Sequence, residues 1–140
     1  MDGARLWNAH VATGVALADF ARTADTVMLS FSKGLGCPVG AILVGDEATI
    51  RRAHMVRKRL GGGMRQSGIL AAAALYALDA HLERLGDDHA NARTFADLVA
   101  GAAGVRVVSP DTNIVMVDLP AGVTTTATVA AARDDGVLLS

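Results

Sequence analysis

The sequence is poor in cysteine, in aromatic residues and in net charge. Cys37 is its one cysteine, which excludes an internal disulfide and leaves any metal site to other ligands, and which fits a reducing cytoplasm. Aromatic residues make up 4% of the chain, and its formal net charge is −1. A chain so close to neutrality has no general attraction to nucleic acid or to a membrane surface, so we expect neither as a partner.

Long hydrophobic runs are missing as well. The most apolar uncharged segments, residues 34–45 and 68–78, fall far below the roughly 18 residues that suggest a membrane span. Asp2 and Arg5 stand where a secretory signal would have a basic stretch and an apolar core, so we expect no such signal and a cytoplasmic location. The chain does have 51% hydrophobic residues and abundant Ala and Gly, which is typical of a globular α/β domain with tight helix-on-sheet packing.

The first part of the chain is predicted to be α/β. Residues 5–22 have helical composition with a break near Gly14, and residues 26–31 and 41–44 read as short apolar strands on either side of the turn "KGLGCPVG". Asp46 is a suitable N-cap for a helix over 47–60 that the glycines at 61–63 end. Two wholly apolar strands predict burial on both faces of a sheet.

The rest of the chain predicts a long helix and then a smaller lobe. Residues 66–85 form a helix that is apolar nearly all round over 69–78, so we expect it to be buried in the fold or at a subunit interface. Another helix follows over 88–103. Strands at 105–108 and 113–119, a helix at 126–133 and a strand at 137–139 then predict the start of an α+β lobe.

Lys33 stands between a strand-like run and a glycine-rich turn. A lysine amine can form a Schiff base with an aldehyde, and Gly34 and Gly36 would let a bulky ligand approach the backbone. Ser30 or Ser32 could hydrogen-bond a phosphate. Most lysines beside a turn are simply solvated, so these residues alone favour a surface lysine.

The opening residues "MDGARLWN" place an acidic residue and an arginine close together. A carboxylate at a strand end, followed by glycine and a helix, can project into a cleft, and Arg5 follows three residues later. The simpler interpretation is a helix N-cap by Asp2, or a surface ion pair with Arg5 that contributes under about 1 kcal/mol.

A basic stretch lies between Glu47 and Asp79, where no acidic residue occurs. A solvated helix face is the simpler interpretation, and a phosphate or polyanion partner is the alternative. The loop "GGGMRQSG" before a helix could hold an anion on free N–H groups. The stretch contains Arg51, Arg52, Arg57, Lys58, Arg59 and Arg65.

Other standard sites are missing from the sequence. Neither glycine-rich segment matches the G-x-G-x-x-G or P-loop pattern, which argues against NAD and ATP. No G-x-S-x-G elbow occurs. The histidines have no paired metal-ligand spacing, so we expect no metal site; they are His10, His54, His81 and His89.

Taken together, "MDGAR", "SFSKGLGCPVG" and "RKRLGGGMRQSG", in this order, resemble the L-threonine aldolases. These are pyridoxal-phosphate (PLP) enzymes of the aspartate-aminotransferase fold type. The resemblance is strong over residues 1–85 and looser beyond. It implies that residues 1–85 are part of the PLP-binding large domain, with a mixed sheet and flanking helices. Residues 86–140 would be a linking helix and an incomplete small domain.

The resemblance also implies residue roles. Lys33 matches the lysine that binds PLP covalently, and Asp2 matches the aspartate that pairs with the pyridine nitrogen. Arg5 matches an arginine that holds the substrate carboxylate, for which a planar donor fork is well suited. Lys58 and Arg65 match positions near the cofactor phosphate, reached across a subunit interface. The implied reaction cleaves L-threonine, allo-threonine and related β-hydroxy-α-amino acids to glycine and an aldehyde, in a homo-oligomer.

The resemblance leaves further expectations. Relative to the family the chain looks truncated at both ends, so we expect it to expose part of the apolar surface of residues 27–29 and 41–44. We also expect it to be poorly stable and to have little or no aldolase activity alone. Three other interpretations stay open. They are another PLP lyase reaction such as β-elimination, a phosphate- or nucleic-acid-binding module built on residues 51–65, and an assembly fragment that carries no complete site.

Overall fold

The computed structural model describes residues 1–139. It consists of two compact units, Met1–Asp88 and His89–Ser140, which are described separately. The division expected from the sequence, 1–85 and 86–140, concerns the parts of a larger enzyme and stays a prediction.

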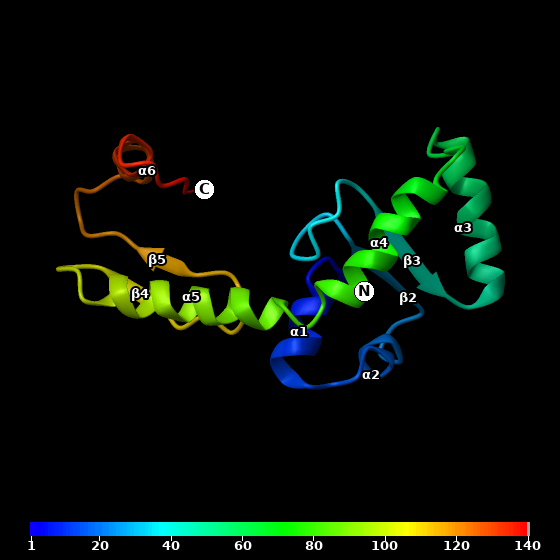
Figure 1. The fold of residues 1–140 in the computed structure, drawn as a ribbon, viewed down its shortest axis with the longest axis horizontal. Helices are drawn as coiled ribbons and strands as arrows, with labels where there is room; N and C mark the ends of the chain where they lie inside the picture. Colours follow the sequence, from blue (N-terminus) through cyan, green and yellow to red (C-terminus); the bar gives the residue numbers. More distant parts are fainter. Residues whose placement is uncertain (140) are drawn as a thin grey trace. The chain divides into compact units, whose positions relative to one another are not determined.

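A three-stranded mixed sheet forms the first unit. Its strands are β1 (Asp2–Gly3), β2 (Thr26–Ser30) and β3 (Ala41–Gly45), in the order β1-β2-β3. β1 runs parallel to β2. β2 pairs antiparallel with β3, and both are labelled in Figure 1. The mixed sheet and both longer strands were predicted, and the structure confirms them.

Gly3 lets β1 approach β2 closely. A Cβ at this position would lie 2.7 Å from the Met28 carbonyl oxygen, which is backbone and cannot move aside. We expect Gly3→Ala to lower the free energy of unfolding by about 1–3 kcal/mol, the usual cost of overpacking. Urea unfolding followed by circular dichroism measures this. Gly68→Ala is the matched control, because a Cβ there meets nothing within 4 Å. Equal stability of the two variants would contradict the close approach.

Helices α1 (Leu6–Thr13) and α2 (Leu17–Ala21) follow β1. The break between them falls at Gly14 as predicted, because Gly14 adopts φ +70°, which glycine reaches without strain. Helix α3 (Glu47–Arg59) also has its predicted bounds. It ends just before Gly61, which has φ +80°.

Asp46 caps α3 as predicted. Its Oδ1 accepts the Thr49 N–H at 2.7 Å, and Oδ2 accepts the Thr49 hydroxyl at 3.2 Å. The backbone hydrogen bond from Thr49, helped by that hydroxyl, lowers the pKa of Asp46 below its ordinary 3.8. A lowered folded-state pKa means that the cap stabilises α3 fully above the ordinary value and loses this contribution as pH falls through the folded-state pKa.

We expect Asp46→Asn to keep α3 formed at neutral pH, because asparagine caps as well as aspartate does. The variant should lose less helicity than the parent chain when pH falls below about 4, since its cap has no carboxylate to protonate. Circular dichroism at 222 nm across an acid titration measures the difference. Parallel acid transitions in the two proteins would contradict this role of Asp46.

Helix α4 (Gly68–Ala80) is shorter and more exposed than expected. The sequence predicted a helix over 66–85, buried in the fold or at a subunit interface. Burial within this chain is found only for part of the helix, and burial at a subunit interface stays a prediction. Ala74 and Ala77 form a narrow stripe toward the core, whereas Ile69, Leu75 and Tyr76 are 77%, 63% and 65% exposed. Composition indicates how apolar a helix is, but neighbouring elements decide which of its faces they cover.

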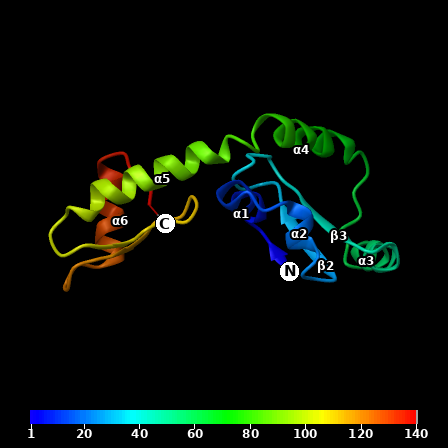
Figure 2. The same cartoon turned by 90° about the horizontal axis from the view of Figure 1, so that it is seen from below.

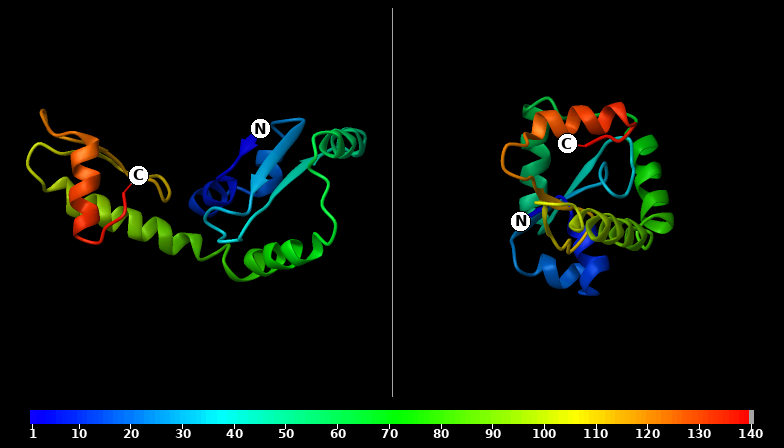
Figure 3. Two further views of the ribbon diagram at one scale, coloured as in Figure 1. Left: turned by 90° about the horizontal axis from the view of Figure 1, so that it is seen from above. Right: turned by 90° about the vertical axis from the view of Figure 1, so that its left-hand side faces the viewer.

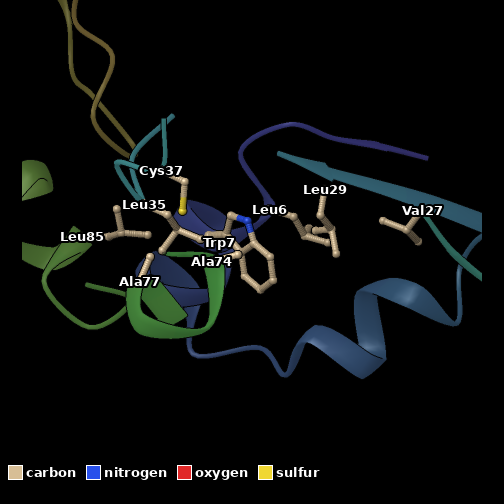
Figure 4. Packing of buried hydrophobic residues seen from close by; sticks show 9 residues of the cluster. All are labelled: Leu6, Trp7, Val27, Leu29, Leu35, Cys37, Ala74, Ala77 and Leu85. Atoms are coloured by element: carbon tan, nitrogen blue, oxygen red, sulfur yellow. The ribbon is translucent and has the colours of Figure 1, made fainter. Parts of the chain in front are cut away.

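The core of the first unit lies between β2, α1, α4 and the turn that joins β2 to β3. Figure 4 shows Leu35 and Cys37 of this turn beside Trp7, Ala77 and Leu85. Leu35 and Leu85 are each 1% exposed. The turn is therefore part of the packed core, which is uncommon for a connecting segment. The cluster comprises Leu6, Trp7, Val27, Leu29, Leu35, Cys37, Ala74, Ala77 and Leu85.

The two apolar strands differ in burial. Val27 and Leu29 of the central strand β2 are buried, so these two residues are not in the part of the apolar surface that is exposed. In β3 every residue is exposed, including Ile42, Leu43 and Val44 at 44%, 41% and 41%, which confirms the expected exposure there. Burial of β3 on both faces, expected from its composition, is therefore not found.

Helix α5 (Leu85–Ala100) begins in the first unit and continues into the second. There β4 (Arg106–Val108) and β5 (Met116–Asp118) form an antiparallel pair, which α6 (Thr125–Asp134) follows. These elements were predicted. The strand predicted at 137–139 was wrong: in the part of the chain that the structure describes, these residues follow Gly136 at φ +80° and pair with no strand.

Among the described residues, no helix is both long and apolar enough to cross a membrane.

Candidate functional site

The parallel pairing of β1 and β2 brings two of the sequence motifs to one edge of the sheet. Asp2 is paired with Met28 and Gly3 with Leu29, so both strands end at the same edge. Asp2 is the first residue of the two-residue strand β1, Arg5 follows that strand, and Lys33 comes from the turn that follows β2. The carboxyl ends of parallel strands are where α/β proteins usually bind ligands.

Asp2 presents a carboxylate at this edge. Its Oδ1 accepts the Ala4 N–H at 3.0 Å, and among residues 1–139 the structure shows no partner for Oδ2. The N-cap position of α1 belongs to Arg5, without a side-chain cap, so the simpler interpretation of Asp2 as the helix cap was wrong. Asp2 and Arg5 do not form an ion pair either, and both side chains are exposed.

Lys33 begins a tight turn. The Gly36 N–H donates to the Lys33 carbonyl oxygen at 2.8 Å, and Gly36 adopts φ +72°. The Lys33 side chain is exposed, whereas Leu35 within the turn is buried. Gly34 lies against the helices, because a Cβ there would be 2.7 Å from Leu85 Cδ2 and 3.5 Å from Asn8 Oδ1. The turn therefore exposes the Lys33 amine to solvent, while Gly34 and Leu35 of the same turn pack against the core.

Trp7 connects α1 to the end of β2, immediately before this turn. Its Nε1–H donates to the Ser30 carbonyl oxygen at 2.9 Å, in a buried position. Its ring stacks on Phe31, with centroids 5.9 Å apart and planes 24° apart. Trp7 was not among the residues with a predicted role, although a single tryptophan two residues after Arg5 in a chain so poor in aromatics was a usable signal.

The serines beside the turn differ in accessibility. Ser30 is buried, with its Oγ 3.5 Å from Ser32 Oγ, while Ser32 is exposed. Of the two candidate phosphate contacts, Ser32 is the one that a ligand from solvent can reach.

Lys58 and Arg65 make no contact with the sheet edge that carries Asp2 and the Lys33 turn, among the contacts between described residues. α3 starts beyond Gly45, which pairs with Thr26 at the opposite end of β2 (Figure 2). Lys58 lies over Gly63, where a Cβ would be 2.9 Å from Lys58 Cδ. Within residues 1–139 no hydrogen bond or ion pair joins Lys58 or Arg65 to Asp2, Arg5 or Lys33.

The basic stretch is a solvated surface. Arg51 pairs with Glu47 on the same helix. Its other cations are exposed, and within the described range none of them has an ion-pair partner. In residues 1–139 no group of three or more His, Cys, Asp or Glu side chains is placed to bind a metal ion.

Comparisons with known proteins point to one family. The family model described as Beta-eliminating lyase matches residues 1–121. The chain is 49% identical over 117 residues to the low specificity L-threonine aldolase of Escherichia coli K12, covering 84% of this chain and 35% of that protein. It is 45% identical over 122 residues to the low-specificity L-threonine aldolase of Candida albicans, covering 86% and 32%. The chain thus spans about a third of the length of the curated relatives it matches.

Solved structures agree. A putative L-allo-threonine aldolase from Listeria monocytogenes superposes with TM-score 0.85 at 26% identity, covering 99% of this chain and 40% of that one. An alpha-aminoadipate aminotransferase from Thermus thermophilus, crystallised with a phosphopyridoxyl-leucine, superposes with TM-score 0.59 at 20% identity, covering 88% and 34%. The second likeness shows a shared fold.

Proposed function

Because the chain belongs to the Beta-eliminating lyase family, we propose that it forms the lysine-bearing part of a PLP-dependent L-threonine aldolase. The observation that carries the proposal is the shared sheet edge. There an exposed lysine on a core-packed turn and a carboxylate with an unpartnered oxygen come from adjacent parallel strands.

The groups at this edge fit PLP, on which enzymes of this family depend. The Lys33 amine would hold the aldehyde carbon. The free Oδ2 of Asp2 would accept the N–H of the pyridine ring and so hold a proton on it. When bound, PLP supplies an electron sink for negative charge at the substrate Cα.

Arg5 is proposed to hold the substrate carboxylate. Its exposed guanidinium has no ion pair in the described residues and offers the planar donor fork that a carboxylate fits. Lys58 and Arg65 are proposed to contact the cofactor phosphate of a neighbouring subunit, since both are exposed and α3 follows β3 at the end of the sheet opposite to the Lys33 edge. The substrates would be L-threonine, allo-threonine and related β-hydroxy-α-amino acids, cleaved to glycine and an aldehyde.

A β-elimination remains the second candidate, because the family takes its name from that reaction. Phenylserine separates the two reactions: aldol cleavage releases benzaldehyde and glycine, whereas elimination of water releases ammonia and a keto acid. We expect benzaldehyde.

Assembly and location are part of the proposal. The exposed apolar side chains of α4, with Ile69 at 77% and Tyr76 at 65%, support a homo-oligomer, dimer or tetramer. A buried free thiol at Cys37 is compatible with a reducing cytoplasm. Sedimentation of the purified chain tests the first statement.

A chimera tests the function itself. This chain replaces the matching 117-residue segment of the Escherichia coli aldolase, and acetaldehyde release from L-threonine is measured with PLP present. We expect activity in the chimera and none when it carries Lys33→Ala. An inactive chimera that is folded and oligomeric would contradict the proposal.

A further inference from the structure

His81 touches the turn that carries Lys33. Its Nδ1 lies 2.9 Å from the carbonyl oxygen of Leu35, although the two residues are 46 positions apart in the chain. Leu35 is the third residue of the turn that Lys33 begins and Gly36 closes. A Cβ on Gly36 would lie 3.9 Å from the same ring nitrogen. The imidazole therefore lies against the half of the turn opposite to Lys33.

The hydrogen bond defines the tautomer of His81. A carbonyl oxygen only accepts, so Nδ1 must carry the proton and donate it. In a neutral imidazole this leaves Nε2 without a proton, and in the cation Nδ1 still donates. The contact to Leu35 is thus retained in both protonation states of His81.

His81 is itself well placed to act as an anchor. It is the C-cap residue of α4, and its N–H donates to the Ala77 carbonyl at 2.9 Å. The Tyr76 ring packs against the imidazole edge to face, with centroids 5.5 Å apart and planes at 86°. Two views show the β2–β3 turn beside the C-terminal end of α4 (Figures 2 and 3). The side chain that holds the turn is therefore itself fixed at a helix end.

The Leu35 carbonyl depends on this donor. No backbone N–H in residues 1–139 donates to it. The side chain of Leu35 is 1% exposed, so the residue is held twice, by apolar packing and by the imidazole. Packing keeps Leu35 in the core, and the directional bond sets the orientation of the peptide plane that follows it.

We propose that His81 is a positioning residue: its Nδ1–H, donated to the Leu35 carbonyl, holds the Lys33 turn in the conformation that presents the Lys33 amine to the aldehyde of PLP. The role toward PLP rests on the proposed function. The holding of the turn does not, and it can be measured without cofactor.

Two substitutions separate the hydrogen bond from the bulk of the ring. His81→Phe keeps a ring against Tyr76 and removes the donor. His81→Asn restores an N–H donor close to the position of Nδ1. His10→Phe is the matched control, because His10 Nδ1 makes the same kind of bond, 2.7 Å to the Val15 carbonyl, at the end of α1.

Amide hydrogen exchange of the chain without PLP is the first measurement. In His81→Phe we expect the Gly36 and Cys37 amides to exchange about 2- to 12-fold faster, the factor that one net hydrogen bond provides. His81→Asn should exchange like the parent chain, and His10→Phe should leave these two amides unchanged. Equal acceleration in His81→Asn, or equal acceleration of the β2 amides, would overturn the proposal. Nitrogen-15 spectra should show neutral His81 protonated at Nδ1, and protonation at Nε2 would overturn it too.

PLP labelling is the second measurement. We expect the PLP concentration that half-labels Lys33 to rise about 2- to 12-fold in His81→Phe and to recover in His81→Asn. If His81→Phe takes up PLP at Lys33 like the parent chain although its Gly36 and Cys37 amides exchange faster, the positioning role toward PLP is overturned. The hydrogen bond from His81 would then hold the turn without affecting PLP. If the parent chain itself takes no label at Lys33, the proposed function fails, and the exchange experiment still decides whether His81 holds the turn.

Discussion

Lys33→Ala is expected to abolish covalent capture of PLP by this chain. The purified protein is titrated with PLP, reduced with borohydride and mapped by peptide mass. We expect the reduced pyridoxyl group on Lys33 in the parent chain and no specific label in the variant. Lysine is required because an amine must form the bond to the aldehyde carbon.

The chain contains its own control for this experiment. Lys58 is its one other lysine, and it is exposed in the same unit. Nonspecific reaction would label Lys58 as readily as Lys33, so the ratio of the two labels measures specificity. Lys58→Ala should leave the covalent bond at Lys33 intact and, through its proposed phosphate contact, weaken PLP binding only where subunits associate. Equal labelling of both lysines would mean that the Lys33 turn does not form a cofactor site.

Trp7→Ala is expected to cause the largest loss of stability in the first unit. The ring is 7% exposed, stacks on Phe31 and donates to the Ser30 carbonyl. Replacing a buried tryptophan by alanine costs about 3–5 kcal/mol through lost burial and the cavity that remains. Since domains of this size have about 5–15 kcal/mol in total, the substitution should remove a large fraction of the free energy of unfolding.

Trp7→Phe separates packing from hydrogen bonding at the same position. It keeps an aromatic ring beside Phe31 and leaves the Ser30 carbonyl without its donor, which costs about 1–3 kcal/mol. Urea unfolding monitored by circular dichroism ranks the variants. Ile69→Ala is the matched control, because Ile69 is 77% exposed and its truncation should change stability by less than about 0.5 kcal/mol. A Trp7→Ala loss as small as that of Ile69→Ala would show that Trp7 is not part of a packed core.

The local elements of this protein follow from its sequence. Asp46 and the glycines at 61–63 define α3, and Gly14 ends α1, because caps and positive-φ glycines act within a few residues of their own position. The hydrogen bond that closes the Lys33 turn, from the Gly36 N–H to the Lys33 carbonyl oxygen, is local as well. The three motifs that predicted the family lie in the part of the chain that the family model matches.

Burial depended on contacts between distant elements. β2 and β3 are both apolar, yet β2 is central and covered by α1, while β3 is an edge strand and exposed. No hydropathy pattern distinguishes the two, because burial is a property of the neighbours that a strand acquires. The same reason explains why α4, apolar nearly all round, buries only its alanine stripe in this structure.

The sequence by itself determined the segments in which Asp2, Arg5 and Lys33 lie. It also determined where the helices of these segments end and where the chain turns. Tertiary structure decided that the segments that carry Asp2 and Lys33 lie at the same edge of the sheet, through the parallel pairing of β1 with β2. It also placed Trp7 on the Ser30 carbonyl and His81 on the Leu35 carbonyl, across 23 and 46 positions of sequence. Each of these side chains could donate to many carbonyl oxygens, and the local sequence does not identify which one. The partner is decided when the elements between the two residues fold and pack, because buried polar groups are then paired with the groups nearest to them.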